Sequence, residues 1–237
     1  MKLSILMPVY NEAERIADAL KQALAVDYPC EVELVVVDDG SRDGTADILA
    51  AAADDGRIRV ITHKRNAGKG AAIKTAVENA EGEYMVILDA DLEYDPQDIP
   101  KLLEPVLDGR AKVVYGNRTF GSHSAYSFWY VIGNRAVTTA ANVLFNSYIG
   151  DLETCFKLLP VALYRSLEIR SRGFGMEAEV TGKLLRRRIR PYEVPISYRA
   201  RGREEGKKIT WRDGVEALWI LSRERVRSAP RATSVRS

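Results

Sequence analysis

Histidine and cysteine are both scarce in this chain of 237 residues, which contains only two of each. Cys30 and Cys155 lie far apart without a Cys-x-x-Cys spacing, so they predict neither a disulfide framework nor a zinc site. With so few histidines, none stands out as a general base. We therefore expect a protein of a reducing compartment that does its chemistry with other side chains.

Long hydrophobic runs are also missing. No stretch approaches the roughly 18 consecutive apolar residues that a transmembrane helix needs. The apolar opening, residues 1–8, is too short for a signal peptide. We therefore expect a cytoplasmic protein whose contact with a membrane is peripheral and at the cytosolic face.

The formal net charge is only +2, but it is unevenly distributed along the chain. Residues 181–237 contain 16 lysines and arginines against 6 acidic residues, whereas residues 1–180 are net acidic. An anionic surface is therefore expected to meet the C-terminal part. Nucleic acid is not the expected partner, because no aromatic residues interleave with the alternating Arg199, Arg201 and Arg203.

An acidic pair follows a short apolar run that reads as a buried strand, residues 84–88. Side chains two positions apart on extended backbone point the same way, so the carboxylates of Asp89 and Asp91 should converge on one spot. Two such anions need a cation between them, and hard oxygen ligands favour Mg²⁺ or Mn²⁺. We predict a divalent metal site here; the alternative is a solvated turn before a helix that begins at Pro96.

Strands and helices are predicted to alternate through the first half of the chain. The predicted strands are residues 3–9, 31–37, 57–62 and 84–88, and the predicted helices are residues 11–26, 42–53 and 71–80. Such alternation is typical of β-α-β units with a parallel sheet, whose ligands bind beyond the carboxyl ends of the strands. Tyr10, Glu12 and Asp39 should lie at this edge. Asn11 and Glu14 predict a capping box at the first helix.

Two other classes of α/β enzyme fit these residues less well. A dinucleotide-binding enzyme needs Gly-x-Gly-x-x-Gly after its first strand, and residues 8–12 contain no glycine. A phosphatase of the haloacid dehalogenase kind normally carries Asp-x-Asp on its first strand, followed by Thr or Val where this chain has Glu93.

Four motifs in the first half resemble family 2 of the nucleotide-sugar glycosyltransferases. They are Pro8-Val9-Tyr10-Asn11-Glu12, Val37-Asp38-Asp39-Gly40-Ser41-x-Asp43-Gly44-Thr45, Asn66-x-Gly68-Lys69-Gly70 and Asp89-Ala90-Asp91. The resemblance implies the α/β GT-A fold, a mixed, mostly parallel sheet flanked by helices. It implies that the base and ribose pocket is lined by Pro8, Tyr10, Glu12, Val37 and Asp39. It also implies that Asp89 and Asp91, with Ala90 between them, hold a metal ion on the donor diphosphate; Lys69 is suited to a phosphate or the sugar.

Candidate acceptor residues lie in the second half. Arg118 follows a strand predicted at residues 111–115 and could bind a phosphate or form a surface salt bridge. Arg135 is the one cation on an otherwise apolar helix, residues 127–145, whose aromatic start is either core or a lipid contact. Asp151 and Glu153 share an i, i+2 spacing, and either could act as a base if the acceptor is an alcohol, or both are solvated acids.

The second half resembles the polyprenyl-phosphate branch of this family, which includes the dolichol-phosphate mannose synthases. The motifs are Gly116-Asn117-Arg118, Asp151-x-Glu153-Thr154-Cys155-Phe156-Lys157, Gly173-Phe174-x-x-Glu177-x-Glu179, Tyr198-x-x-Arg201 and Glu205-Gly206-Lys207-Lys208-Ile209-x-Trp211-x-Asp213-Gly214. The resemblance implies that Glu93 adds to the metal site and that Arg118 and Arg135 receive the acceptor phosphate. Arg201 and Lys207 would close on the donor phosphates.

The resemblance predicts a metal-dependent, inverting glycosyltransferase. It would move mannose from GDP-mannose to a polyprenyl or dolichyl monophosphate, with UDP-glucose as the second choice of donor. A transferase acting on a saccharide hydroxyl and a nucleotide-sugar-binding regulatory module are the alternatives. We expect one catalytic domain, residues 1–222, and a basic flexible tail, residues 223–237, with the chain held at the membrane peripherally or by a membrane-anchored partner.

Overall fold

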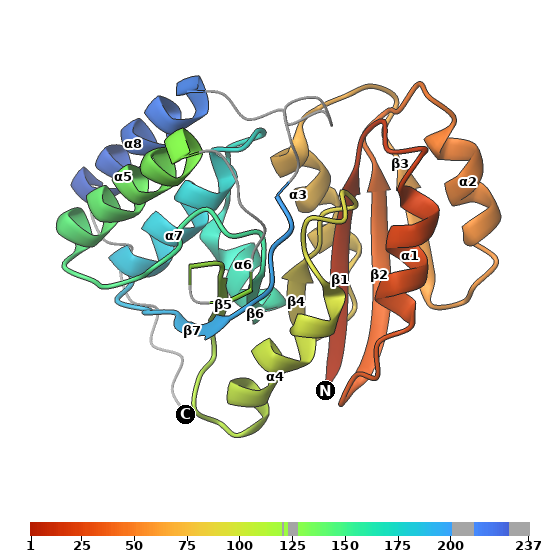
Figure 1. Cartoon of the computed structure of the whole chain (residues 1–237), viewed down its shortest axis with the longest axis horizontal. Helices are drawn as coiled ribbons and strands as arrows, with labels where there is room; N and C mark the ends of the chain where they lie inside the picture. The colour runs from red at the N-terminus through yellow and green to blue at the C-terminus, as the bar shows by residue number, and fades with distance from the viewer. Residues whose placement is uncertain (120, 123–127, 201–210, 228–237) are drawn as a thin grey trace.

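A seven-stranded sheet forms the centre of the protein, seen here in a computed structural model that describes residues 1–119, 121–122, 128–200 and 211–227. Its strand order is β3-β2-β1-β4-β6-β5-β7 (Figure 1). The strands are β1 (Lys2–Val9), β2 (Glu31–Asp38), β3 (Ile58–Thr62), β4 (Tyr84–Ile87), β5 (Val114–Asn117), β6 (Lys157–Pro160) and β7 (Tyr192–Pro195).

The sheet is mixed and mostly parallel. β1 pairs in parallel with both β2 and β4, β2 with β3, and β5 with β7. β6 runs antiparallel to its two neighbours, β4 and β5. The sheet predicted from the sequence is therefore confirmed, and the carboxyl ends of β1, β2 and β4 share one edge.

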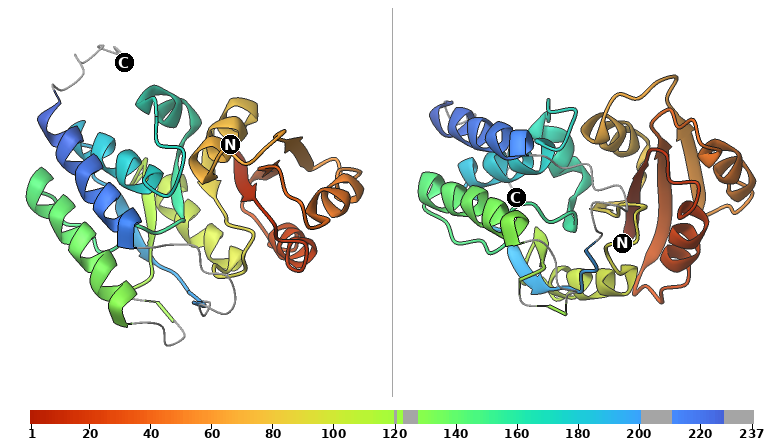
Figure 2. Two further views of the ribbon diagram at one scale, coloured as in Figure 1. Left: turned by 90° about the horizontal axis from the view of Figure 1, so that it is seen from above. Right: turned by 45° about the horizontal axis from the view of Figure 1, so that its top comes forward.

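Helices surround this sheet. They are α1 (Ile16–Leu24), α2 (Thr45–Ala52), α3 (Lys69–Asn79), the 3-10 helix η1 (Pro96–Asp98), α4 (Ile99–Leu107), α5 (Phe128–Phe145), α6 (Val161–Leu167), α7 (Met176–Arg186) and α8 (Trp211–Val226). The pair α1 and α2 lies at one end of the molecule, and α5, α7 and α8 form a layer at the other (Figures 1 and 2). α8 packs against both α5 and α7.

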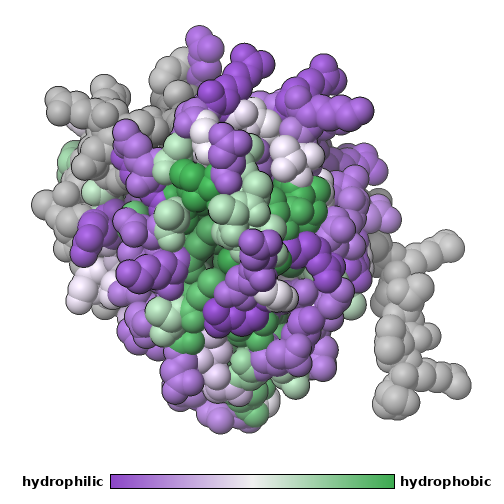
Figure 3. All heavy atoms as spheres, turned by 90° about the vertical axis from the view of Figure 1, so that its right-hand side faces the viewer, coloured by the Kyte–Doolittle hydropathy of each residue, from purple (hydrophilic) through white to green (hydrophobic). Residues whose placement is uncertain are grey.

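The core follows from the apolar strands. Most of β1 and β2 is buried, and a large cluster of apolar side chains joins the sheet to α1, α3 and α4. A second, smaller cluster lies between α5, α7 and α8, around Val137, Ala178 and Leu221. On the side of the edge strand β3, apolar side chains occupy the centre of the face and polar ones surround them (Figure 3).

The capping box predicted at the first helix is wrong. α1 begins at Ile16, and its N-cap, Arg15, makes no side-chain capping bond. Asn11 adopts a left-handed φ of 54°, and its Oδ1 accepts a hydrogen bond from the backbone N–H of Arg42 at 2.9 Å. Asn11 therefore ties the loop after β1 to the loop after β2, because both loops leave the same edge of the sheet.

The C-terminal helix α8 continues to Val226 and so extends past residue 222, where the sequence placed the end of the catalytic domain. Among the described residues, no helix combines the length and the apolar character needed to cross a membrane.

Candidate active site

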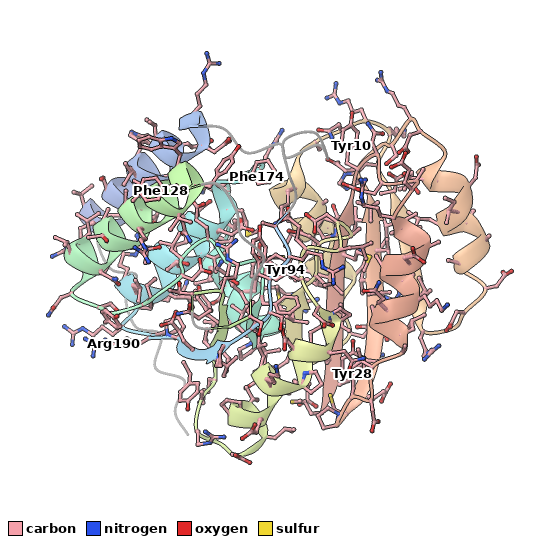
Figure 4. The ribbon with its side chains drawn as sticks, in the orientation of Figure 1. Tyr10, Tyr28, Tyr94, Phe128, Phe174 and Arg190 are labelled. Atoms are coloured by element: carbon pink, nitrogen blue, oxygen red, sulfur yellow. The ribbon has the colours of Figure 1, made fainter. Side chains whose placement is uncertain are left out.

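A cavity of about 380 Å³ opens at the carboxyl ends of the central strands. Its walls come from the loops after β1, β2, β4 and β5, from the start of α3 and from α7. Figure 4 shows Tyr10 on the β1 side of this opening, Phe174 on the α7 side and Tyr94 between them. The two halves of the sheet thus contribute facing walls.

Most of the predicted site residues line this cavity. They are Pro8, Tyr10, Glu12, Asp39, Lys69, Asp89, Ala90, Asp91, Glu93 and Arg118. Arg201 and Lys207 lie outside the described residues. The cavity also contains residues to which the sequence assigned no separate role, namely Asn66, Tyr94, Cys155, Phe174, Glu177, Tyr198 and Asp213.

Two predicted residues lie elsewhere. Val37 is fully buried in β2, so its side chain belongs to the core and not to a base pocket. Arg135 is exposed on α5 and does not line the cavity. Its neighbour Asn134 points inward instead, because adjacent helical positions are about 100° apart, and donates to Asp151 Oδ1 at 2.9 Å.

The acidic pair spans the end of the strand and a turn, because Asp91 belongs to the turn that follows β4. β4 ends at Ile87, and Ala90 and Asp91 form a turn before Leu92, whose φ is 62°. Both carboxylates still reach the cavity. Asp89 Oδ2 accepts from the Lys69 ammonium at 2.8 Å, and Asp91 Oδ1 accepts from the backbone N–H of Glu93 at 3.1 Å.

These two carboxylates fit a divalent ion only if a ligand adds further oxygens. Among the described residues, no three His, Cys, Asp or Glu side chains are grouped as a ready-made metal site. Glu93, the predicted third ligand, is buried and accepts a hydrogen bond from the Tyr198 hydroxyl at 2.6 Å. The donor set therefore suits Mg²⁺ or Mn²⁺ shared with a diphosphate.

Asp39 fixes the loop that carries Lys69. Its carboxylate accepts hydrogen bonds from the backbone N–H groups of Ala67 at 2.9 Å and Gly68 at 2.8 Å. His63 Nδ1 lies 2.7 Å from the same carboxylate, and His63 Nε2 lies 2.9 Å from Thr75 Oγ1. Sequence reasoning missed His63, although it directly follows β3 and so had to reach the same edge as Asp39.

Arg118 reaches the cavity but is already paired with Asp151. Its Nε and Nη2 donate to the two carboxylate oxygens at 2.6 and 2.7 Å, and its guanidinium lies 5.0 Å from the centre of the Tyr198 ring. Asp151 is completely buried. Burial opposes its charge, but Arg118 outweighs it and keeps the pKa of Asp151 below its usual value.

Asp151 and Glu153 lie in different environments and therefore differ in their ability to act as a base. Asp151 is held by Arg118 and cannot readily accept a proton, whereas Glu153 lines the cavity. Burial raises the pKa of Glu153 above its ordinary value, although nearby Arg118 opposes the shift. Of these two acids, only Glu153 has the position and the proton affinity of a base.

A buried lysine holds the loop that carries both acids. Lys157 is completely buried, and its ammonium donates to the carbonyl of Leu152 at 2.9 Å and to the carbonyl of Thr154. Burial lowers the pKa of Lys157 to about 8. Its place inside the apolar run Phe156-Lys157-Leu158-Leu159 was the signal in the sequence that it has a specific partner.

Comparison with known proteins connects this geometry to one family. The glycosyltransferase AglJ of Haloferax volcanii is 30% identical over 197 residues, which are 82% of this chain and 62% of AglJ. The undecaprenyl-phosphate 4-deoxy-4-formamido-L-arabinose transferase of Pseudomonas fluorescens is 38% identical over 131 residues, 54% of this chain and 38% of that enzyme. This chain therefore spans less than two thirds of the length of either relative.

The fold has a close structural counterpart. Glucosyl-3-phosphoglycerate synthase from Mycobacterium tuberculosis, crystallised with Mn²⁺, UDP and glucosyl-3-phosphoglycerate, aligns with a TM-score of 0.67 at 20% identity. The alignment covers 94% of this chain and 79% of the synthase. This likeness confirms the predicted GT-A fold. Residues 4–167 match the family described as Glycosyl transferase family 2, and the chain therefore belongs to that family.

Proposed function

We propose that this protein is a metal-dependent, inverting glycosyltransferase that moves a sugar from a nucleotide sugar to a polyprenyl monophosphate. The observation that carries the proposal is that Asp89 and Asp91 line the same cavity as Tyr10, Glu12 and Asp39. One cavity thus offers carboxylates for a metal-bound diphosphate and a wall for a nucleoside. The name of the Pseudomonas relative, an undecaprenyl-phosphate transferase, supports a lipid phosphate as the acceptor.

The donor is proposed to lie across the central edge of the sheet. Its base and ribose would contact the walls formed by Pro8, Tyr10 and Glu12, and its diphosphate would lie near Asp89 and Asp91. Mannose from GDP-mannose is our first choice, by resemblance to the dolichol-phosphate mannose synthases. UDP-glucose is the second choice, and the structural counterpart with Mn²⁺ and UDP supports it.

The proposed reaction needs no general base. A lipid monophosphate is already ionised near neutral pH, so its oxygen can attack the anomeric carbon directly. The new bond joins that carbon to the phosphate oxygen, the bond to the nucleoside diphosphate breaks, and attack from the opposite face inverts the anomeric configuration. A bound divalent ion would stabilise the negative charge on the departing diphosphate.

The chain's own cations supply the remaining charge in this proposal. Arg118, held in place by Asp151, presents the rest of its guanidinium to the acceptor phosphate. Lys69 faces the donor side from the start of α3. Arg201 and Lys207 keep their proposed role at the donor phosphates.

A donor and acceptor screen tests the proposal. The protein is incubated with GDP-mannose or UDP-glucose, Mn²⁺ and a polyprenyl monophosphate, and the lipid product is analysed by mass spectrometry and by NMR of the anomeric proton. We expect a glycosyl phosphate lipid of inverted configuration from one of the two donors. Transfer to a saccharide alcohol in place of the lipid phosphate, or no transfer from any nucleotide sugar, would contradict the proposal.

A saccharide hydroxyl is the second candidate acceptor, because Glu153 lies in the cavity with a raised pKa. An alcohol must lose its proton during attack, and a carboxylate with a raised pKa is suited to take it. Glu153 would then be the general base, since Asp151 is bound to Arg118.

We also propose that α5 and α8 bring the protein to the cytosolic face of a membrane, directly or through a membrane-anchored partner. Both helices carry large exposed apolar side chains; these are Phe128, Trp129, Ile132 and Val143 on α5 and Val215, Leu218, Trp219 and Val226 on α8. They recur at helical spacing, so each helix presents an apolar stripe. Exposed Arg225 and Arg227 near the end of α8 suit an anionic lipid surface.

A further inference from the structure

Lys69 bridges two carboxylates inside the cavity. Its ammonium lies 2.8 Å from Asp89 Oδ2 and 2.9 Å from Glu177 Oε1. Only 14% of the Lys69 side chain and 7% of the Glu177 side chain are exposed. Lys69 therefore pairs with one of the two carboxylates of the acidic pair and, at the same time, with Glu177 on α7.

The backbone that carries Lys69 cannot move away from the acidic pair without other changes. The backbone N–H of Ala71 donates to the carbonyl of Arg172 at 3.2 Å. Gly68 and Gly70 lie so close to the α6–α7 loop that an added Cβ would come within 2.4 and 2.3 Å of its carbonyl oxygens. The mobile part of Lys69 is thus its long side chain, which can exchange one partner for another while the backbone stays fixed.

Glu177 is well placed to hold that side chain through such an exchange. It lies in the first turn of α7, lines the cavity and is buried. Its second carboxylate oxygen, Oε2, is buried and has no hydrogen-bond partner among the described residues. A buried carboxylate with spare acceptor capacity costs free energy unless a cation stays next to it.

We propose that Glu177 is a positioning residue that keeps Lys69 in the donor site, and that Lys69 is an internal counter-ion which a divalent cation must displace from Asp89. This inference rests on the proposed function, because it assigns a divalent ion to Asp89 and Asp91. An ammonium 2.8 Å from Asp89 Oδ2 repels a divalent ion that binds the same carboxylate, so the two cations compete for Asp89. Glu177 then retains the ammonium at the cavity wall, where it can contact the donor diphosphate.

The first test measures the affinity of the protein for Mn²⁺ in the absence of nucleotide. Electron paramagnetic resonance gives the concentration of unbound Mn²⁺ during a titration, from which the affinity follows. Lys69→Met removes the competing cation, so we expect Mn²⁺ to bind about tenfold more tightly or better. Lys74→Met is the matched control, because Lys74 is an exposed cation on the same helix, and it should leave the affinity within about twofold. Lys69→Gln is measured alongside Lys69→Met in case the methionine variant folds poorly.

The second test asks whether Glu177 acts through Lys69. Glu177→Gln leaves Lys69 with Asp89 as its ion-pair partner among the described residues, so Mn²⁺ should bind more weakly than to the unmodified protein, by about threefold or more. The same substitution is then made in the Lys69→Met variant. There the change in the logarithm of the Mn²⁺ affinity should be less than about half of the change seen when Lys69 is present. An effect through shape or general charge alone would be equal in both backgrounds.

The third test uses the nucleoside diphosphate. With Mn²⁺ saturating, Lys69→Met should weaken GDP or UDP binding in isothermal titration calorimetry by about tenfold, because the ammonium that contacts the diphosphate is gone. The substitution thus has opposite effects on the two ligands.

Unchanged or weaker Mn²⁺ binding by both Lys69 variants would overturn the inference, as would equal effects of Glu177→Gln in the two backgrounds. None of these titrations needs an acceptor or turnover, so a protein that transfers no sugar can still satisfy them. Conversely, if the protein transfers sugar but the titrations do not give the expected results, the proposed function stands and the counter-ion role of Lys69 does not.

Discussion

Arg118 and Asp151 form a buried ion pair at the inner wall of the cavity. Because Arg118 keeps the native pKa of Asp151 below its ordinary value of about 3.9, the unfolded chain takes up a proton first as the pH falls. The stability from this pair is therefore fully present above about pH 5 and is lost as the pH drops through about 3.9 towards the native pKa. We expect the free energy of unfolding to decline in that range.

Asp151→Asn should remove that part of the pH dependence. At pH 7 we expect a loss of about 3 kcal/mol, near the low end for breaking a buried pair, because 15% of the Arg118 side chain is exposed and can be hydrated. Urea unfolding between pH 3 and 7 measures both effects. Asp47→Asn, at an exposed position on α2, is the control. If the free energy of unfolding of Asp151→Asn depended on pH in the same way as that of the unmodified protein, the Arg118–Asp151 pair would not be the source of the pH dependence.

Glu153→Gln distinguishes the two candidate acceptors. If the acceptor is a lipid phosphate, the loss of activity should be less than about tenfold, because no proton has to be removed; if it is an alcohol, the loss should be about a hundredfold or more. The turnover rate with each acceptor decides between them.

The same substitution also has a stability readout. Because burial raises the native pKa of Glu153, the native state holds its proton longer, and stability falls as the pH rises through that pKa. Glu153→Gln should therefore be at least as stable as the unmodified protein at pH 7. A clearly lower melting temperature would mean that the charged carboxylate has a stabilising partner.

The positions of the site residues were predicted well where the end of a strand fixes them, and poorly where packing in the folded chain decides them. Asp39, Asp89 and Asp91 reach the cavity because the strands before them end at one edge. Val37 was assigned to the site by resemblance, whereas its side chain is packed in the core of the sheet. The partners of Lys69 could not be read from the sequence, because Glu177 is 108 positions away and meets it only in the folded chain.

At the scale of elements, the contact between the start of α3 and the α6–α7 loop fixes one wall of the site. Gly70→Ala would place a Cβ 2.3 Å from the carbonyl oxygen of Ser171, so the two segments must separate. We expect a loss of about 1–3 kcal/mol in stability and weaker nucleotide binding. Chemical denaturation and calorimetry with GDP or UDP measure the two effects.

Gly133→Ala provides the opposite expectation within the same chain. Gly133 is exposed on α5, and an added Cβ would meet nothing within 4 Å. Alanine in a helix interior should therefore stabilise the protein by about 0.5–1 kcal/mol. If Gly70→Ala lowered the stability no more than Gly133→Ala does, this result would contradict the close approach of the start of α3 to the α6–α7 loop.

The alternating strands and helices of the first half were predictable because each is a short apolar run or an amphipathic segment bounded by turn residues. The prediction placed β1, β2 and β4 within one or two residues. α6 was not predicted, because its seven residues follow β6 without a loop. The antiparallel direction of β6 was also not predictable, since direction depends on how the chain returns to the sheet and not on local composition.

At the scale of the whole molecule, the apolar stripes of α5 and α8 lie on the layer of helices farthest from α1 and α2 (Figure 1). Replacing Trp129 and Trp219 together by serine should lower binding to vesicles that contain anionic lipid by about tenfold. Sedimentation with vesicles measures this. Leu107→Ser, at an exposed position on α4, should leave binding unchanged. Equal losses in both variants would exclude α5 and α8 as the membrane-facing surface.

The most direct test of the central claim is the release of nucleoside diphosphate in the presence of a polyprenyl monophosphate and Mn²⁺. We predict that release with the preferred donor requires the lipid phosphate, stops when a chelator removes the metal, and falls by about a thousandfold or more in Asp91→Ala, with Asp47→Ala unaffected. Release that persists at the normal rate in Asp91→Ala or with chelator present would contradict the assignment of a metal-bound diphosphate to this acidic pair.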